Sequence, residues 1–117
     1  MTAKRILLVE DEYLVGLDIQ SILTDAGFDV SEPAMNIGAA LDLIKNNKFD
    51  AAVLDVNLGG QSSEEIAARL TDLRIPFILL TGYGRENLPP EVVDATVVEK
   101  PFDEQKLIET IRNLSLA

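Results

Sequence analysis

The stretch Ile6-Leu7-Leu8-Val9-Glu10-Asp11 is an apolar run that stops at two carboxylates. Three further apolar runs also lead to a polar side chain: Ala51 to Leu54 to Asp55, Phe77 to Leu80 to Thr81, and Val97-Val98 through Glu99 to Lys100. Short apolar runs separated by helical segments are typical of strands in a parallel sheet that is covered on both faces. Because ligands of such sheets bind outside the carboxyl ends of the strands, we expect these polar residues to converge on one site.

The composition of the chain sets limits on its class. Its 117 residues suit a single domain spanning 1–117, and the absence of Cys and His excludes disulfides, zinc-thiolate sites and Ser-His chemistry. The apolar runs are far shorter than the roughly 20 residues of a membrane span. The first residues do not predict a signal peptide. We therefore expect a cytoplasmic protein without a membrane partner.

The formal net charge of −10 comes from 20 acidic and 10 basic residues. Such a charge repels the phosphates of nucleic acids, so direct nucleic-acid binding by this domain is not expected. The charge suits a partner with a basic docking face, and solubility alone explains it equally well.

Strand and helix alternate along the whole chain. Apolar residues recur at helical spacing in four segments, namely Val15 to Ala26, Ile37 to Ile44, Ile66 to Leu73 and Leu107 to Leu114. The pattern predicts an α/β fold with a doubly wound five-stranded parallel sheet in the flavodoxin-like strand order 2-1-3-4-5. In that order the first and third strands are neighbours, and so are Glu10, Asp11 and Asp55.

Glycine and proline mark the ends of two elements. Gly27 is a stop signal for the first helix, before a weak second strand around 28–31. Pro89-Pro90 cannot lie inside a helix, so a fourth helix within 85–94 should be short or irregular.

Capping signals mark two helix starts. A loop is expected over 56–61, after which Ser62 and Glu65 have the spacing of a capping box that opens the third helix. Asp103 is expected to cap the last helix.

The expected cluster of carboxylates needs positive charge, because like charges repel and an unpaired buried charge is costly. Lys100 supplies one charge, and Mg²⁺, which prefers oxygen ligands and often binds carboxylates together with a phosphate, supplies the rest. Asp55 can then attack a phosphoryl group to form an aspartyl-phosphate, and Thr81 can donate a hydrogen bond to it. Taken singly, each residue also has an ordinary structural explanation, such as a helix N-terminal acidic pair or a solvated lysine. The ordered combination favours the phosphoryl site.

Four motifs, taken together, are highly specific: Val9-Glu10-Asp11-Glu12, Leu54-Asp55-Val56-Asn57-Leu58-Gly59, Leu80-Thr81-Gly82-Tyr83 and Lys100-Pro101-Phe102. They resemble the motifs of the receiver domains of two-component response regulators, and the match spans essentially the whole chain. The resemblance implies that Asp55 is the phosphoacceptor and that Thr81 and Lys100 sense and hold the phosphoryl group.

The same resemblance implies a metal-ligand set. Asp11 is expected to be the main metal carboxylate, with Glu10 acting mostly through water and Asn57 offering its backbone carbonyl to Mg²⁺. The Lys100-Pro101 bond is expected to be cis, as it usually is in receiver domains.

One position departs from the common receiver pattern. Receiver domains often carry a switch Tyr or Phe three residues before the lysine, where this chain has Val97. With Pro76-Phe77 and Thr81-Gly82-Tyr83, this resembles a receiver subgroup with the motif Pro-Phe-Xaa-Phe-Ala-Thr-Gly-(Gly/Tyr), although Leu79-Leu80 stand in place of its Phe-Ala. We expect the Tyr83 loop and the fourth helix to rearrange on phosphorylation; the alternative is that Tyr83 is simply an exposed loop aromatic.

The predicted function is that of a single-domain response regulator without an output domain. A sensor histidine kinase or a histidine phosphotransfer protein would donate the phosphoryl group to Asp55 in an Mg²⁺-dependent reaction. The signal would pass to an unknown downstream protein through phosphorylation-dependent contacts, or onward by phosphorelay. The chain is not expected to be an enzyme beyond catalysing its own phosphorylation and dephosphorylation.

Three alternatives have weaker support. An Mg²⁺-dependent phosphatase or phosphotransferase would need an acid-base carboxylate where Asn57 stands. A flavin or nucleotide binder would need an anion-binding loop where Glu10-Asp11-Glu12 presents negative charge, and Gly59-Gly60 has no dinucleotide-binding context. A receiver that no longer takes phosphate would not need the full set of acidic pair, Asp55, Thr81 and Lys100.

Overall fold

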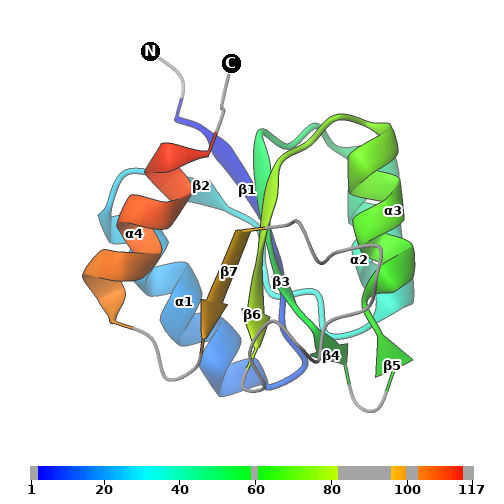
Figure 1. The fold of residues 1–117 in the computed structure, drawn as a ribbon, viewed down its shortest axis with the longest axis horizontal. Coiled ribbons are helices and arrows are strands. Elements are labelled where there is room, and N and C mark those ends of the chain that lie inside the picture. The colour runs from blue at the N-terminus through cyan, green and yellow to red at the C-terminus, as the bar shows by residue number, and fades with distance from the viewer. Residues whose placement is uncertain (1–2, 59–60, 82–95, 100–102, 115–117) are drawn as a thin grey trace.

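The structure is a computed structural model that describes residues 3–58, 61–81, 96–99 and 103–114 (Figure 1). Its main sheet is parallel and has five strands in the order β2-β1-β3-β6-β7. The strands of this sheet are β1 (Arg5–Val9), β2 (Asp29–Val30), β3 (Ala51–Asp55), β6 (Phe77–Thr81) and β7 (Thr96–Glu99). Counted along the chain, the order is 2-1-3-4-5, which confirms the predicted topology.

Four described helices cover the two faces of this sheet: α1 (Tyr13–Asp25), α2 (Ile37–Asn46), α3 (Glu64–Asp72) and α4 (Glu104–Asn113). Helices α1 and α4 lie on one face and α2 and α3 on the other (Figure 1). Each face of the sheet has its own hydrophobic core, and alternate residues of β1 point into one or the other. Ile6 and Leu8 pack with α1 and α4, while Leu7 and Val9 pack with α2 and α3. The central strands are therefore apolar at successive positions because both of their faces are buried.

Helix ends follow some of the predicted signals. Gly27 follows α1 with a φ of 102°, a backbone conformation that glycine adopts without a steric cost. At the start of α2, the Asn36 side chain accepts a hydrogen bond of 2.8 Å from the Ala39 N–H. Asp103 occupies the N-cap position of α4 without a side-chain capping bond.

The connection after β3 differs from the prediction. Instead of a loop over 56–61, the chain forms an antiparallel hairpin of β4 (Asn57–Leu58) and β5 (Gln61–Ser62). Leu58 is buried in the core on the α2 and α3 face, which favours an ordered backbone over an open loop. The Gly59-Gly60 pair between the two strands is a sequence signal for a two-residue hairpin connection that the loop prediction did not use.

Two predictions for α3 were wrong. The N-cap is Ser63 rather than Ser62, and the Ser63 hydroxyl donates to the Val56 carbonyl at 3.3 Å instead of capping the helix. Leu73, predicted on the buried face, follows the end of α3 and is 50% exposed. The hairpin explains the first difference, because it ties Ser63 back to Val56. The short or irregular helix predicted within 85–94 lies outside the described residues.

Of the helices in the described part of the chain, not one combines the length and the apolar character that crossing a membrane requires.

Candidate metal and phosphoacceptor site

The parallel pairing of β1 with β3 brings the predicted acidic residues together. Val9, the last residue of β1, is in register with Leu54, so Glu10 and Asp11 follow one strand where Asp55 ends the other. One carboxylate oxygen from each of Glu10, Asp11 and Asp55 lies within 4.8 Å of the others. Two sequence segments far apart in the chain thus deliver three oxygen donors to one point at the edge of the sheet.

This cluster is held in a largely buried setting. Glu10 is fully buried, Asp55 is 6% exposed and Asp11 is partly buried. The Glu10 N–H donates to the Ala34 carbonyl at 3.0 Å, and its Oε1 accepts a hydrogen bond of 3.2 Å from the Glu12 N–H. Carboxylates at this depth are stable only when charge partners or hydrogen bonds compensate for lost hydration. A cation bound at this cluster would offset the repulsion between its like charges.

The donor set fits a hard divalent cation. Mg²⁺ takes oxygen ligands at about 2.1 Å, so two of its ligands lie at most about 4.2 Å apart. The carboxylate oxygens lie within 4.8 Å of one another, close to that spacing. Small side-chain movements, or a water molecule between Glu10 and the ion, would let the three residues share one Mg²⁺.

Thr81 lies at the same edge, one strand further along the sheet. It ends β6, whose Leu80 is in register with Asp55, and it is only 2% exposed. The Val56 N–H continues this ladder past Asp55 by donating to the Leu80 carbonyl at 3.0 Å. The hydroxyl-bearing residue predicted to contact the phosphoryl group is therefore adjacent in the sheet to the predicted phosphoacceptor.

The remaining predicted site residues are placed only in part. Asn57 is the first residue of β4 and follows Asp55 by two positions in the sequence. Val97 lies in β7 opposite Leu79 and packs against the core on the α2 and α3 face. Three residues with predicted roles lie outside the described residues: Tyr83, Lys100 and Pro101. Their roles, and the cis bond expected at Pro101, stay predictions.

The residues that contact Glu10 and hold its backbone and carboxylate in position were not singled out from the sequence. The Ala34 carbonyl and the Glu12 N–H bond its backbone and its carboxylate, respectively. A third neighbour is Gly16 of α1, where an added Cβ would lie 3.6 Å from the Glu10 Cβ. The signal available for Gly16 was a glycine inside a helical pattern, which lowers helix stability and so usually has a packing reason.

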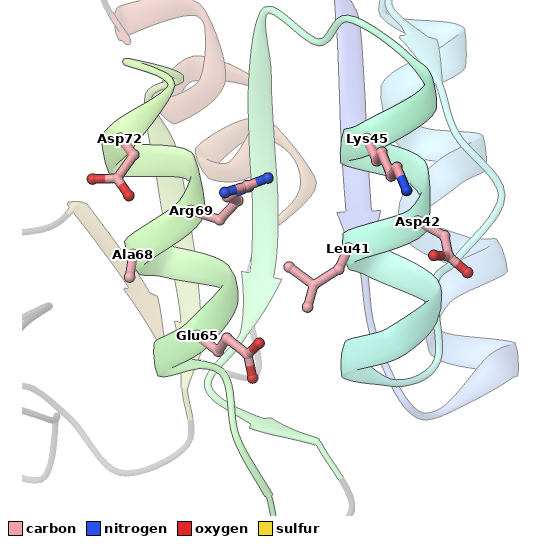
Figure 2. A pocket seen from close by; sticks show the side chains of 7 residues that line it. All are labelled: Leu41, Asp42, Lys45, Glu65, Ala68, Arg69 and Asp72. Carbon is pink, nitrogen blue, oxygen red and sulfur yellow. The ribbon is translucent and has the colours of Figure 1, made fainter.

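A groove of about 430 Å³ lies elsewhere, between α2 and α3. Figure 2 shows Leu41 of α2 and Arg69 of α3 projecting into the space between the helices, whereas Asp72 points away from it. Its lining consists of Leu41, Asp42, Lys45, Glu65, Ala68, Arg69 and Asp72. None of the clustered carboxylates lines this groove, so it is separate from the candidate metal site.

Comparisons with known proteins agree with this geometry. The family model for the response regulator receiver domain matches residues 6–112. The sensory transduction protein LytT of Bacillus subtilis is 34% identical over 92% of this chain and 46% of its own length. Sporulation initiation phosphotransferase F of the same organism is 26% identical, over 96% of this chain and 94% of its own. The solution structure of SdrG from Sphingomonas melonis superposes with a TM-score of 0.82 at 30% identity, covering 96% of this chain and 97% of that one.

The chain spans about half the length of the first curated relatives it matches, 46% of LytT and 55% of the transcriptional regulatory protein PdtaR of Mycobacterium tuberculosis. The matches with these longer proteins each cover 92% of this chain.

Proposed function

Because the chain belongs to the response regulator receiver domain family, we propose that it is a phosphorylation-controlled switch whose phosphoacceptor is Asp55. The observation that carries this proposal is the meeting of Glu10, Asp11 and Asp55 at the adjacent ends of β1 and β3. In a receiver domain, that meeting supports Asp55 as the carboxylate that accepts phosphate.

The residues proposed to hold Mg²⁺ are Asp11, Asp55 and the backbone carbonyl of Asn57, with Glu10 acting through water. Bound Mg²⁺ would offset the negative charge of the carboxylates and of the phosphoryl oxygens. The three carboxylate oxygens already lie within 4.8 Å of one another, so only small side-chain movements would be needed to bind an ion.

The proposed transfer uses Asp55 as nucleophile. One of its carboxylate oxygens forms a bond to phosphorus while the phosphorus–nitrogen bond of a donor phosphohistidine breaks, and the donor imidazole takes up a proton. Thr81 would donate its hydroxyl to a phosphoryl oxygen, and Lys100 would pair with another. Water later hydrolyses the acyl phosphate, which releases inorganic phosphate and returns Asp55 to its carboxylate form.

The proposed donor is a sensor histidine kinase or a histidine phosphotransfer protein, met in the cytoplasm. One relative of similar length is named a phosphotransferase, which supports a place in a relay of phosphoryl groups. The chain would catalyse only its own phosphorylation and dephosphorylation. With a net charge of −10, it is suited to a downstream protein rather than to nucleic acid.

The proposed response is a shift between two conformations that differ in their contacts with the phosphoryl group. Val97 is aliphatic and partly buried against the core, so no aromatic ring at this position can swing between states. We therefore propose that the Tyr83 segment, rather than Val97, responds to phosphorylation; the resemblance to the subgroup with the Thr-Gly-(Gly/Tyr) motif supports this assignment.

Acetyl phosphate with Mg²⁺ tests the proposal directly. Mass spectrometry of the chain should show one added phosphoryl group that hydroxylamine removes, since hydroxylamine cleaves acyl phosphates. The adduct should be absent from Asp55→Asn and from samples containing a chelator. A folded chain that takes no phosphate from acetyl phosphate or from phosphohistidine donors would contradict the proposal and would favour a binding module.

A further inference from the structure

We propose that Gly16, on the buried side of α1, is a positioning residue that holds Glu10 in the carboxylate cluster. This inference rests on the proposed function, because it assigns Gly16 an effect on Mg²⁺ binding at Glu10, Asp11 and Asp55.

The first observation is the close approach of α1 to the segment before α2. A Cβ added at Gly16 would lie 2.7 Å from the Cβ and 2.8 Å from the Cγ of Pro33. Real Cβ atoms essentially never approach other atoms this closely, so any side chain at this position forces a movement. The proline ring is rigid and cannot rotate away. Only a residue without a side chain lets α1 sit where it does.

The second observation is that the Pro33 segment is fastened to β1 and cannot easily give way. The Ser31 N–H donates to the Ile6 carbonyl at 2.9 Å, and the Ser31 hydroxyl accepts from the Leu8 N–H at 3.0 Å. The Ala34 N–H donates to the Leu8 carbonyl at 2.9 Å. These bonds extend the pairing of β1 beyond β2, on both sides of Pro33.

The third observation is that Glu10 is hydrogen-bonded both to the Pro33 segment and to the start of α1. Its N–H donates to the Ala34 carbonyl at 3.0 Å, and its Oε1 accepts from the N–H of Glu12, the N-cap of α1. The Glu12 carbonyl in turn accepts from the Gly16 N–H at 2.9 Å. If a side chain at Gly16 pushed α1 outward, Glu12 would move with it. The hydrogen bond that orients the Glu10 carboxylate would then change.

The same substitution would also place the new Cβ in contact with Glu10. The added Cβ would lie 3.6 Å from the Glu10 Cβ, which is ordinary contact in the present position but leaves no room to move α1 toward β1. Relief is therefore available only by displacing α1 or the Pro33 segment. Both displacements alter the support of Glu10, a residue whose carboxylate lies within 4.8 Å of its two acidic neighbours.

The test is the Mg²⁺ affinity of Gly16→Ala, measured by calorimetry at a temperature where circular dichroism shows the variant folded. We expect a loss of at least about tenfold, the usual size of effect when the support of a metal ligand is removed. Gly38→Ala is the matched control, because a Cβ there meets only the Asn36 Oδ1 at 3.5 Å. Its Mg²⁺ affinity should stay within about twofold of the unmutated chain.

Pro33→Gly removes the ring atoms that the new Cβ would meet. The double variant Gly16→Ala with Pro33→Gly should therefore recover most of the Mg²⁺ affinity, relative to Pro33→Gly alone. If Gly16→Ala does not fold, this double variant carries the test, and a double variant that is equally unfolded contradicts the inference.

The outcomes separate this inference from the function on which it rests. A folded Gly16→Ala variant with the affinity of the unmutated chain would overturn the role of Gly16 and leave the proposed function standing. An unmutated chain that binds no Mg²⁺ would overturn both.

Discussion

Val9 of β1 is in parallel register with Leu54 of β3, so the residues that follow them, Glu10 and Asp55, lie side by side at one edge of the sheet. This one pairing turns two unrelated stretches of sequence into a single site. A change in register by one residue would move either carboxylate to the other face of its strand and separate the pair. The chemistry of the site therefore depends on the pairing of the two central strands.

Replacing Asp11 by Asn should lower the affinity for Mg²⁺ at least about tenfold, because it removes a charged oxygen ligand from a cluster of three. Without metal, the same variant should be more stable toward urea by about 1 kcal/mol, since like charges within a cluster repel. Asp18→Asn, an equal charge change at an exposed position of α1, is the control and should alter neither property. Equal Mg²⁺ affinities for the two variants would remove Asp11 from the ligand set.

Magnesium should stabilise the folded chain. An ion that binds only the folded state adds about 1.4 kcal/mol to the free energy of unfolding at ten times its dissociation constant. Urea titrations with MgCl₂, compared with NaCl at equal ionic strength, measure the specific part of this gain, since salt alone also screens the repulsion. If NaCl stabilised the chain as well as MgCl₂, the carboxylates would be responding to ionic strength rather than binding an ion.

The hydroxyl of Thr81 should matter for phosphate acceptance more than for folding. Thr81→Val keeps the shape of a side chain that is 2% exposed but removes the donor. A hydrogen bond to a charged group contributes about 1.5–3 kcal/mol, so phosphorylation by acetyl phosphate should slow by about tenfold. Thr81→Ser keeps the hydroxyl and is the matched control. Equal rates for the Val and Ser variants would mean that the hydroxyl makes no contact with the phosphoryl group.

The Asn36 cap should contribute measurably to stability. Its side chain accepts the Ala39 N–H at 2.8 Å, and losing such a cap costs about 1 kcal/mol. Urea unfolding of Asn36→Ala should show this loss. Asn46→Ala, the same change at the exposed end of α2, should be neutral or slightly stabilising because alanine favours helix.

Most of the fold could be predicted from the sequence because its central strands are buried on both faces. The runs that end at Val9 and Leu54 are apolar at successive positions, as expected for strands that are covered on both faces. Their parallel order follows from the helices between them. The meeting of Glu10, Asp11 and Asp55 then follows from topology alone.

Other features depend on contacts that spacing does not reveal. Leu73 continues the apolar spacing of α3 but falls past its end, where the helix no longer faces the core. The hairpin over 57–62 arises because Leu58 is buried and Ser63 bonds Val56. The support of Glu10 by Gly16 needs the three-dimensional approach of α1 to Pro33. The exposure of Leu73, the hairpin and the close approach at Gly16 all depend on three-dimensional distances that residue types alone do not reveal.

A crystal structure grown with Mn²⁺, an ion that can occupy magnesium sites and is located by anomalous scattering, tests the central claim most directly. We expect one anomalous peak between Asp11 and Asp55, with an oxygen of each coordinated to the same ion. A peak bound elsewhere, or carboxylates of Asp11 and Asp55 that turn away from a shared ion, would contradict it.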